Sequence, residues 1–276
     1  MTHISAADGV RLYVEDHGGG TPVVFVHELA GSCRSFDPQV TAFKSSWRPV
    51  TFNARGYPPS DVPESVASYS QDIAAADIIA VLDGLSIARA HLVGVSMGSA
   101  SVLQAAIRHP ERAASATLAS IGSYSDIDRE EQRATVEASA REMEAKGMAA
   151  MAKIMAAQPA RRRLGQKNPA QAERFIREYA AFSLQGSVNT LRGVQQVRPP
   201  VYVHEARAKL LRLPVLIVLG EEDEMCVRPS QFLARTIPGA RLETLPATGH
   251  VVNLEEPEAF NRLVMAFIES VEAGPR

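Results

Sequence analysis

The chain has 276 residues, of which 46% are hydrophobic and 22% are charged, and its formal net charge is −2. This length is enough for a large core, in one domain or in one domain that carries an insertion. The near-neutral charge argues against a nucleic-acid partner or an anionic membrane surface, and no apolar run approaches the roughly 20 residues that span a bilayer. We therefore expect a globular protein with no nucleic-acid and no membrane partner.

The N-terminus and the cysteine content indicate where the protein works. Residues 1–9 lack the charged and apolar regions of a signal peptide. Only two cysteines occur, Cys33 and Cys226, so we expect no disulfide framework and predict a reduced, cytoplasmic setting. Neither cysteine has a histidine partner that is evident from the sequence. We expect both to be small buried hydrophobic residues rather than second nucleophiles.

From the N-terminus to about residue 121, apolar runs typical of strands alternate with helical patterns. Strands are predicted at 10–15, 22–26, 48–52, 91–95 and 114–121. Residues 68–71, Ser-Tyr-Ser-Gln, resemble a capping box and open a helix predicted to run to about Leu85. A helix after the fourth strand should end near Pro110, because proline cannot continue the helical hydrogen bonds. This alternation favours a parallel α/β sheet.

The next stretch, residues 123–207, loses this alternation. Residues 127–155 are rich in good helix formers, and Asn168 is the expected N-cap of a further helix. That helix contains Phe175, Ile176, Tyr179 and Phe182. Strands are again predicted at 214–219 and 241–245, and helices at 229–236 and 256–271. We therefore predict an α/β core of residues 1–122 and 208–276, with a helical cap inserted at 123–207.

A Gly-x-Ser-x-Gly turn joins the strand at 91–95 to the helix that follows it. Gly94 and Gly98 let the backbone turn sharply without a Cβ clash, and the turn lifts the hydroxyl of Ser96 clear of the sheet edge. The amide of Met97, at the start of the helix, points to where an oxyanion would develop. This pattern predicts that Ser96 is a nucleophile.

A serine nucleophile needs a histidine base, and the histidine needs a carboxylate. His250 lies in a loop just past the last predicted strand, at the edge where open parallel sheets bind ligands, and is the predicted base. The histidines that position excludes are His3, His17, His91, His109 and His204. Asp223, just past the end of the preceding strand, is the predicted acid. We expect Glu222 and Glu224 to be a solvated charge run, and Asp126 is the weaker alternative.

The order Ser96, Asp223, His250 is that of α/β-hydrolases, and the sequence resembles this family over nearly its whole length. The family's closing segment is matched by Gly249, His250, Glu255, Pro257 and Phe260. Residues 53–61 resemble the family's Asp-x-Arg-Gly-x-Gly-x-Ser loop, with Asn53 in place of the aspartate. The resemblance implies a mostly parallel, eight-stranded sheet flanked by helices, with an opening hairpin and an inserted helical cap.

The resemblance also implies an oxyanion hole formed by the backbone amides of Leu29 and Met97. The family usually has His-Gly after its third strand, whereas this chain has His27-Glu28. Either Glu28 faces solvent or pairs with an arginine such as Arg55, or it enters the pocket, where it would favour a cationic or hydrogen-bond-donating substrate or position water. The side chains expected in the pocket are His27, Glu28, Phe182 and Val251.

Two further groups of residues lie in the predicted cap. Residues 161–163, three arginines, either belong to a solvated loop or hold a substrate carboxylate by bidentate hydrogen bonds. Packing within the cap is expected of Met143, Met148, Met151 and Met155. We find no metal-ligand cluster and no phosphate-binding loop in the sequence, so we expect neither a metal nor a cofactor.

These features predict a serine hydrolase that cleaves a small-molecule carboxylic ester or lactone, most similar to enol-lactonases and related esterases. The serine at position 96 argues against haloalkane dehalogenases and epoxide hydrolases, which carry aspartate there. The alternatives are a carbon–carbon hydrolase of aromatic ring-cleavage products, a cofactor-free perhydrolase and a ligand receptor on the same fold. Val251 and Val252 count against the first, because those enzymes usually carry an aromatic residue soon after the histidine. The acyl group, the alcohol group and the oligomeric state stay open.

Overall fold

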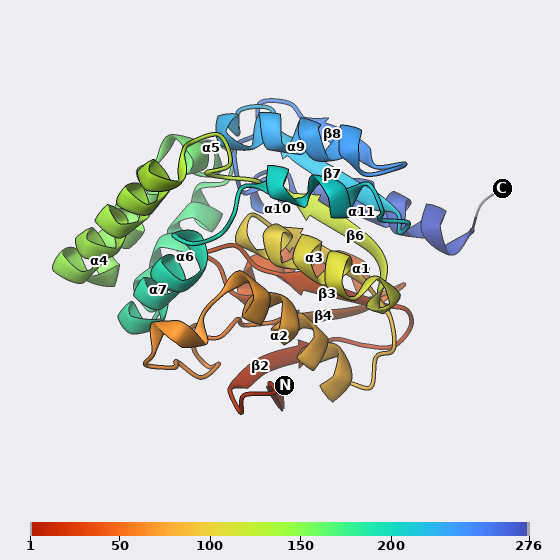
Figure 1. Ribbon diagram of the computed structural model, residues 1–276, viewed down its shortest axis with the longest axis horizontal. Helices are drawn as coiled ribbons and strands as arrows, with labels where there is room; N and C mark the ends of the chain where they lie inside the picture. The colour runs from red at the N-terminus through yellow and green to blue at the C-terminus, as the bar shows by residue number, and fades with distance from the viewer. Residues whose placement is uncertain (1, 275–276) are drawn as a thin grey trace.

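The computed structural model describes residues 2–274, which contain an eight-stranded sheet (Figure 1). The strand order is β1-β2-β4-β3-β5-β6-β7-β8. β1 pairs antiparallel with β2, and β2 antiparallel with β4, whereas the other pairings are parallel. The strands are β1 (Thr2–Ser5), β2 (Arg11–Asp16), β3 (Pro22–Val26), β4 (Arg48–Phe52), β5 (Ala90–Val95), β6 (Ala113–Ala119), β7 (Val215–Gly220) and β8 (Arg241–Leu245). The predicted fold class is confirmed, and β1 and β2 form the opening hairpin.

Helices cover both faces of the sheet, and each face has its own apolar core. On one face lie α2 (Gln71–Gly84), α3 (Met97–Arg108), α8 (Glu205–Ala208) and α9 (Glu224–Thr236). On the other face lie α1 (Asp37–Phe43), α10 (Val252–Glu255) and α11 (Pro257–Glu272). Leu82 and Val102 are buried in the first core, and Phe43 and Phe260 in the second. Burial on both faces is the reason why β3 and β7 are continuous apolar runs and why β5 is apolar apart from His91.

A helical segment lies beside the sheet, at the left of Figure 1. It contains α4 (Arg129–Ala157), α5 (Pro159–Lys167), α6 (Pro169–Ala180), α7 (Leu184–Thr190) and a π-helical turn over Leu191–Gln195. α4 is interrupted at Gly147, where φ is 73°. Asn168 caps α6 as predicted, because its side chain accepts a hydrogen bond from the amide of Gln171 at 3.1 Å. Met143, Met148 and Met151 pack in the apolar core of this segment, as predicted.

Two predicted helix starts are wrong. α2 is capped by Ser70 rather than by Ser68, because Ser70 Oγ accepts a hydrogen bond from the amide of Ile73 at 3.1 Å. α9 begins at Glu224 and contains Pro229, whereas we predicted that it begins at this proline. Proline is most common in the first turn of a helix, and that preference misled the prediction.

The helices within residues 2–274 include none that is both long and apolar enough to cross a membrane.

Candidate active site

The serine turn between β5 and α3 is strained and closely packed. Ser96 has φ 53° and ψ −110°, which residues with a Cβ rarely adopt. A Cβ on Gly94 would lie 2.5 Å from the carbonyl carbon of Gly98, and a Cβ on Gly98 would lie 2.0 Å from the carbonyl oxygen of Val26. Both positions therefore need glycine, and the turn holds the Ser96 hydroxyl at the carboxyl end of β5.

The structure brings Ser96, His250 and Asp223 into one chain of hydrogen bonds. His250 Nε2 lies 2.7 Å from Ser96 Oγ, and His250 Nδ1 lies 2.8 Å from Asp223 Oδ2. His250 is 7% exposed and Asp223 is 1% exposed. A carboxylate at Nδ1 keeps the imidazole proton there and leaves Nε2 free to accept a proton from the serine. The arrangement can therefore convert the Ser96 hydroxyl into a nucleophile.

The other acidic residues that we considered lie elsewhere. Glu222 is exposed and forms an ion pair with Arg163 of α5. Glu224 is exposed at the start of α9. Asp126 accepts a hydrogen bond from the hydroxyl of Tyr202. Among the acidic candidates, Asp223 alone hydrogen-bonds the imidazole of the predicted base within the described residues.

Charge and backbone contacts hold the acid and the base in place. Burial by itself would raise the pKa of Asp223, but the charge and hydrogen bond of His250, together with the neighbouring side chains of Cys226 and Ser120, lower this pKa below its ordinary value. The carboxylate of Glu255 accepts hydrogen bonds from the amides of Gly249 at 2.7 Å and Val251 at 3.2 Å, on either side of the histidine. Burial raises the pKa of Glu255, although these two amides partly offset it. Glu255 therefore holds the loop that carries His250. The sequence analysis did not predict this role for Glu255.

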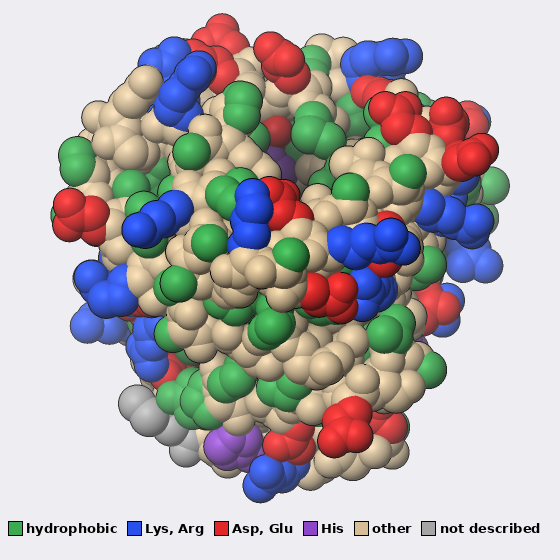
Figure 2. Space-filling view, turned by 90° about the vertical axis from the view of Figure 1, so that its left-hand side faces the viewer, with side chains coloured by type: hydrophobic (Ala, Val, Ile, Leu, Met, Phe, Trp, Pro, Cys, Tyr) green, Lys and Arg blue, Asp and Glu red, His purple; other side chains and the backbone are tan. Residues whose placement is uncertain are grey.

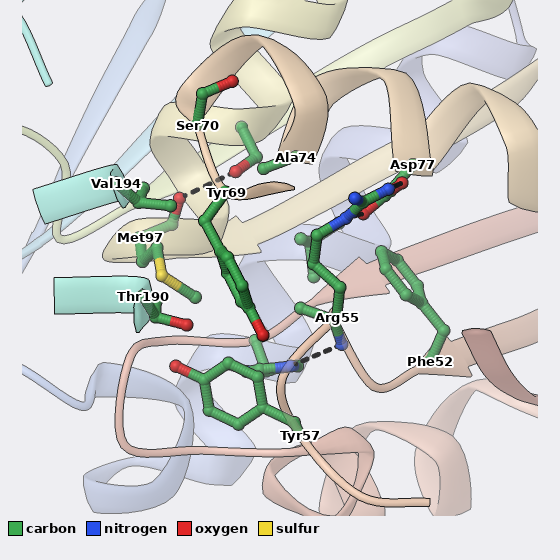
Figure 3. Close-up of a pocket in the computed structure, with 14 residues that line it drawn as sticks. Phe52, Arg55, Tyr57, Tyr69, Ser70, Ala74, Asp77, Met97, Thr190 and Val194 are labelled. Atoms are coloured by element: carbon green, nitrogen blue, oxygen red, sulfur yellow. Dashed lines mark hydrogen bonds and ion pairs between the residues drawn. The ribbon is translucent and has the colours of Figure 1, made fainter. Parts of the chain in front are cut away.

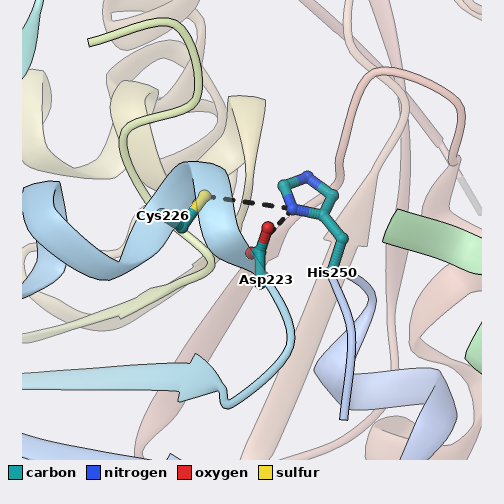
Figure 4. Close-up of side chains that lie close together, drawn as sticks. All are labelled: Asp223, Cys226 and His250. Carbon is teal, nitrogen blue, oxygen red and sulfur yellow. Dashed lines mark hydrogen bonds and ion pairs between the residues drawn. The ribbon is translucent and has the colours of Figure 1, made fainter. Parts of the chain in front are cut away.

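Cys33 and Cys226 are buried, as predicted, but Cys226 lies beside a histidine that the sequence did not show as its neighbour. Its Sγ is 3.9 Å from His250 Nδ1 (Figure 4), and it donates a hydrogen bond to the Ser120 carbonyl at 3.3 Å. Asp223, Cys226 and His250 place three possible metal-ligand atoms within 4.8 Å of one another, a cluster that we did not predict. Burial raises the pKa of the Cys226 thiol well above its usual value, and a protonated thiol is neither a nucleophile nor a metal ligand. Asp223 Oδ2 and His250 Nδ1 already hydrogen-bond each other, so the hydrogen-bonded chain accounts for the proximity of these atoms without a metal ion.

A buried histidine orients the backbone amide of Leu29, which follows β3. His27 Nε2 accepts a hydrogen bond from the amide of Ala54 at 3.0 Å, so the ring proton lies on Nδ1, which donates to the Glu28 carbonyl at 2.7 Å. Burial lowers the pKa of His27, which keeps the ring neutral. The carbonyl and N–H of a trans peptide point in opposite directions, so this bond turns the Leu29 N–H away from His27. No protein acceptor in residues 2–274 takes this N–H.

The amide of Met97 is the second predicted oxyanion donor. Met97 is the first residue of α3, and the first N–H groups of a helix have no partner inside the helix. The helix dipole adds partial positive charge at this end. Leu29 shares a cavity with Ser96, and Met97 is the next residue in the chain after Ser96.

The cavity over Ser96 and His250 has a volume of about 140 Å³. Figure 2 shows the face of the molecule formed by the helical segment, with a hollow in which a histidine side chain is visible. The large apolar side chains that this segment contributes to the lining are Met143, Met151, Ile154, Met155 and Leu191. Its polar contributions are Ser139, Glu142, Gln158, Arg161 and Gln195. Sequence analysis did not identify Ile154 or Leu191 as pocket residues, because their direction depends on how the helices pack.

Glu28 is fully buried but does not line this cavity. Ser35 Oγ donates a hydrogen bond to Glu28 Oε1 at 3.2 Å. Arg55 pairs instead with Asp77 at 2.7 Å and Asp8 at 2.6 Å. Both interpretations from the sequence are therefore wrong: Glu28 neither faces solvent nor pairs with Arg55, and it does not enter the pocket.

The other three predicted pocket residues also lie outside this cavity. His27 lines a separate space of about 30 Å³, which is room for about one water molecule. Met97 and Tyr57 line the same space (Figure 3). Phe182 packs edge to face against Tyr57, with ring centroids 5.5 Å apart. Val251 is buried in the apolar core of the helical segment. None of the three lines the cavity that contains Ser96 and His250.

The arginine run lies in helix α5 rather than in a loop, and its three side chains differ. Arg162 is exposed, and Arg163 pairs with Glu222 at the surface. Arg161 is only 7% exposed and lines the same cavity as Ser96 and His250. The expectation of a solvated loop is therefore wrong for Arg161.

Comparisons with known proteins agree with this fold. Residues 21–257 match the alpha/beta hydrolase fold family. The chain is 28% identical over 274 residues to 3-oxoadipate enol-lactonase 1 of Acinetobacter baylyi, covering 98% of this chain and 97% of that protein. It is 27% identical over 254 residues to 3-oxoadipate enol-lactonase 2 of the same organism, covering 90% and 88%. The crystal structure of the enol-lactonase from Burkholderia xenovorans LB400 matches with a TM-score of 0.85 at 22% identity, covering 98% of this chain and 100% of that one.

Proposed function

This chain belongs to the alpha/beta hydrolase fold family, and we propose that this enzyme is a serine hydrolase that cleaves a small carboxylic ester or lactone through an acyl-enzyme. The observation that carries the proposal is the hydrogen-bonded chain from Ser96 through His250 to Asp223, at a cavity of about 140 Å³. Two relatives that match nearly the whole chain are named enol-lactonases, which supports a cyclic or open ester as the substrate.

In the first half of the proposed reaction, Ser96 Oγ attacks the carbonyl carbon of the substrate. Its proton passes to His250 Nε2, 2.7 Å away. Asp223 stabilises the imidazolium that forms, because its carboxylate lies 2.8 Å from Nδ1 and is ionised. The Leu29 and Met97 amides donate hydrogen bonds to the oxyanion of the tetrahedral intermediate.

Collapse of this intermediate breaks the bond to the alcohol oxygen. The alkoxide takes the proton from His250 Nε2, and the acyl group stays on Ser96. In the second half, His250 Nε2 removes a proton from water as the water oxygen attacks the acyl carbonyl. The bond between the acyl carbon and Ser96 Oγ then breaks, Ser96 Oγ takes the proton back from His250 Nε2, and the acid is released. In a lactone the alcohol and the acid are parts of one product.

We further propose that residues 123–207 act as a cap that shapes the substrate pocket. The described helices of this segment supply Met143, Met151 and Leu191 to the cavity over Ser96. These apolar side chains suit a small substrate with an apolar body.

A kinetic panel of short 4-nitrophenyl esters, enol-lactones and dienone ring-cleavage products tests the proposal. We expect turnover of the esters or lactones and its loss in Ser96→Ala. Mass spectrometry should detect the acyl group on Ser96 in a rapidly quenched reaction. Ser139→Ala is the matched control, because Ser139 lines the same cavity without contacting His250. Turnover of the dienones alone, or undiminished activity in Ser96→Ala, would contradict the proposal.

A further inference from the structure

We propose that Arg161 binds a carboxylate on the substrate, so that this enzyme prefers anionic esters or lactones to neutral ones. The inference rests on the proposed function, because it concerns the same cavity. It names a chemical class of substrate and one side chain that selects it.

Arg161 is a buried cation without a protein anion. It is 7% exposed, and no oxygen atom in residues 2–274 accepts a hydrogen bond from its guanidinium group or forms an ion pair with it. Its Nε is fully buried and has no partner. The guanidinium group forms a cation–π contact with Phe175, whose ring centroid lies 5.5 Å from Arg161 Cζ. A buried charge is costly unless an opposite charge approaches it, and arginine stays protonated in proteins.

The other charged residues that line the cavity already have partners. Glu142 binds Lys146 at 2.7 Å. Asp223 binds His250 at 2.8 Å. Arg161 is therefore the one lining residue in the described chain whose charge is not matched by a neighbouring side chain. The cavity is electrostatically complementary to a ligand with one negative charge.

Backbone contacts hold Arg161 close to the reacting groups. The carbonyl of Ala160, the residue before it, accepts a hydrogen bond from the amide of His250 at 2.8 Å. Arg161 and His250 line the same cavity of about 140 Å³, with Ser96. A ligand held by Arg161 would therefore share this space with Ser96 Oγ.

A carboxylate is the anion that fits this residue and this reaction. The planar guanidinium offers parallel N–H groups that match the two oxygens of a carboxylate. Esters and lactones of dicarboxylic acids carry such a group besides the scissile carbonyl. The neighbouring Arg162 is exposed and Arg163 binds Glu222, so neither supplies this contact.

Matched esters test the proposal. The anionic substrates are the mono-4-nitrophenyl esters of succinate, glutarate and adipate, and the neutral controls are the same compounds with the free carboxylate methylated. Arg161→Met should lower kcat/KM for the preferred anionic ester by about 10- to 100-fold, as expected for loss of a charge-assisted hydrogen bond, and should change the neutral ester much less. Methionine keeps an apolar side chain against Phe175.

Three further variants sharpen the result. Arg161→Lys should keep part of the preference for anionic over neutral esters that Arg161→Met loses. Lysine retains the positive charge but lacks the paired N–H groups that bind both carboxylate oxygens. Arg162→Met, one residue along the same helix, should leave the preference unchanged. The chain length with the largest preference reports how far Arg161 lies from Ser96. Equal loss on anionic and neutral esters in Arg161→Met, or no preference in the unmodified enzyme, would overturn the proposal.

A binding measurement separates this proposal from the proposed function. Ser96→Ala protein should bind monomethyl glutarate more tightly than dimethyl glutarate by calorimetry, and Arg161→Met in the same background should abolish the difference. If the esters are not hydrolysed but this difference is observed, the serine hydrolase proposal fails and the carboxylate site stands. If hydrolysis occurs without any difference in binding, the carboxylate site is refuted and the hydrolase stands.

Discussion

Replacing Ser96 by glycine should give a more stable protein than replacing it by alanine. Ser96 has φ 53° and ψ −110°, and a residue with a Cβ held in such a conformation is strained by about 1–3 kcal/mol. Both variants lose the same hydroxyl and its hydrogen bond to His250 Nε2. That loss cancels when the two variants are compared, and the backbone strain remains.

The expected difference follows from two opposing effects. Alanine keeps the strain of about 1–3 kcal/mol, whereas glycine loses about 0.5–1 kcal/mol more conformational entropy on folding. The glycine variant should therefore be more stable by up to about 2.5 kcal/mol. Ser139, inside α4, is the matched control, because its hydroxyl bonds only the Thr135 carbonyl. There glycine should be less stable than alanine by about 1 kcal/mol.

Equilibrium unfolding in urea, followed by circular dichroism, measures the free energy of unfolding of the four variants. The sign of the glycine–alanine difference should be opposite at positions 96 and 139. If Ser96→Gly is less stable than Ser96→Ala by as much as the Ser139 variants differ, the turn is not strained and the reasoning is refuted. The predicted result would mean that the fold gives up stability to expose this hydroxyl.

Three other side chains of the site give further predictions. Asp223→Asn should lower kcat/KM by about 10³–10⁴-fold, because an amide cannot stabilise the imidazolium, and a loss below tenfold would exclude Asp223 as the acid. Because the folded protein lowers the pKa of Asp223 below 3.8, the wild type should be more stable than Asp223→Asn above that pH and lose this advantage as the pH falls further, measured by urea unfolding from pH 7 to 3. Glu28→Gln should leave the ratio of kcat/KM for a cationic and a neutral ester unchanged, because Glu28 does not line the cavity. A changed ratio would show that Glu28 contacts the substrate. Cys226 should react with a thiol reagent only as fast as the protein unfolds, and reaction of the folded protein would show that the thiol is accessible.

Local signals in the sequence were enough to place seven of the eight strands, β2 to β8, and the candidate reacting groups, whereas the hairpin that adds β1 followed only from the family resemblance. The predicted strands at 22–26 and 48–52 agree with β3 and β4 to the residue, because both strands are almost entirely buried. Ser96, Asp223 and His250 each follow a strand that ends at the same edge of the sheet. Parallel strands bring their carboxyl ends together, so their order in the chain predicts which loops meet.

The cavity could not be predicted in this way, because it depends on the rotation of helices whose packing is set by distant residues. In α5, Arg161 and Leu164 face inward, whereas Arg162 faces solvent. Three identical residues in a row give no sequence pattern from which to predict which of them is buried. Cys226 became a neighbour of His250 because α9 begins five residues before Pro229. Glu28 is buried by contacts with the 3₁₀ turn at Cys33–Phe36, which the sequence analysis did not predict.

The position of α5 links the base and the proposed anion site through the backbone rather than through side chains. The Ala160 carbonyl accepts the His250 amide at 2.8 Å, and Lys167, at the other end of the helix, donates to Thr248 Oγ1 at 3.1 Å. Substitution of the Arg161 side chain removes neither bond, so His250 should keep its place against Ser96 in Arg161→Met. A selective loss on anionic esters would then report charge recognition, because a displaced base would slow neutral and anionic esters alike.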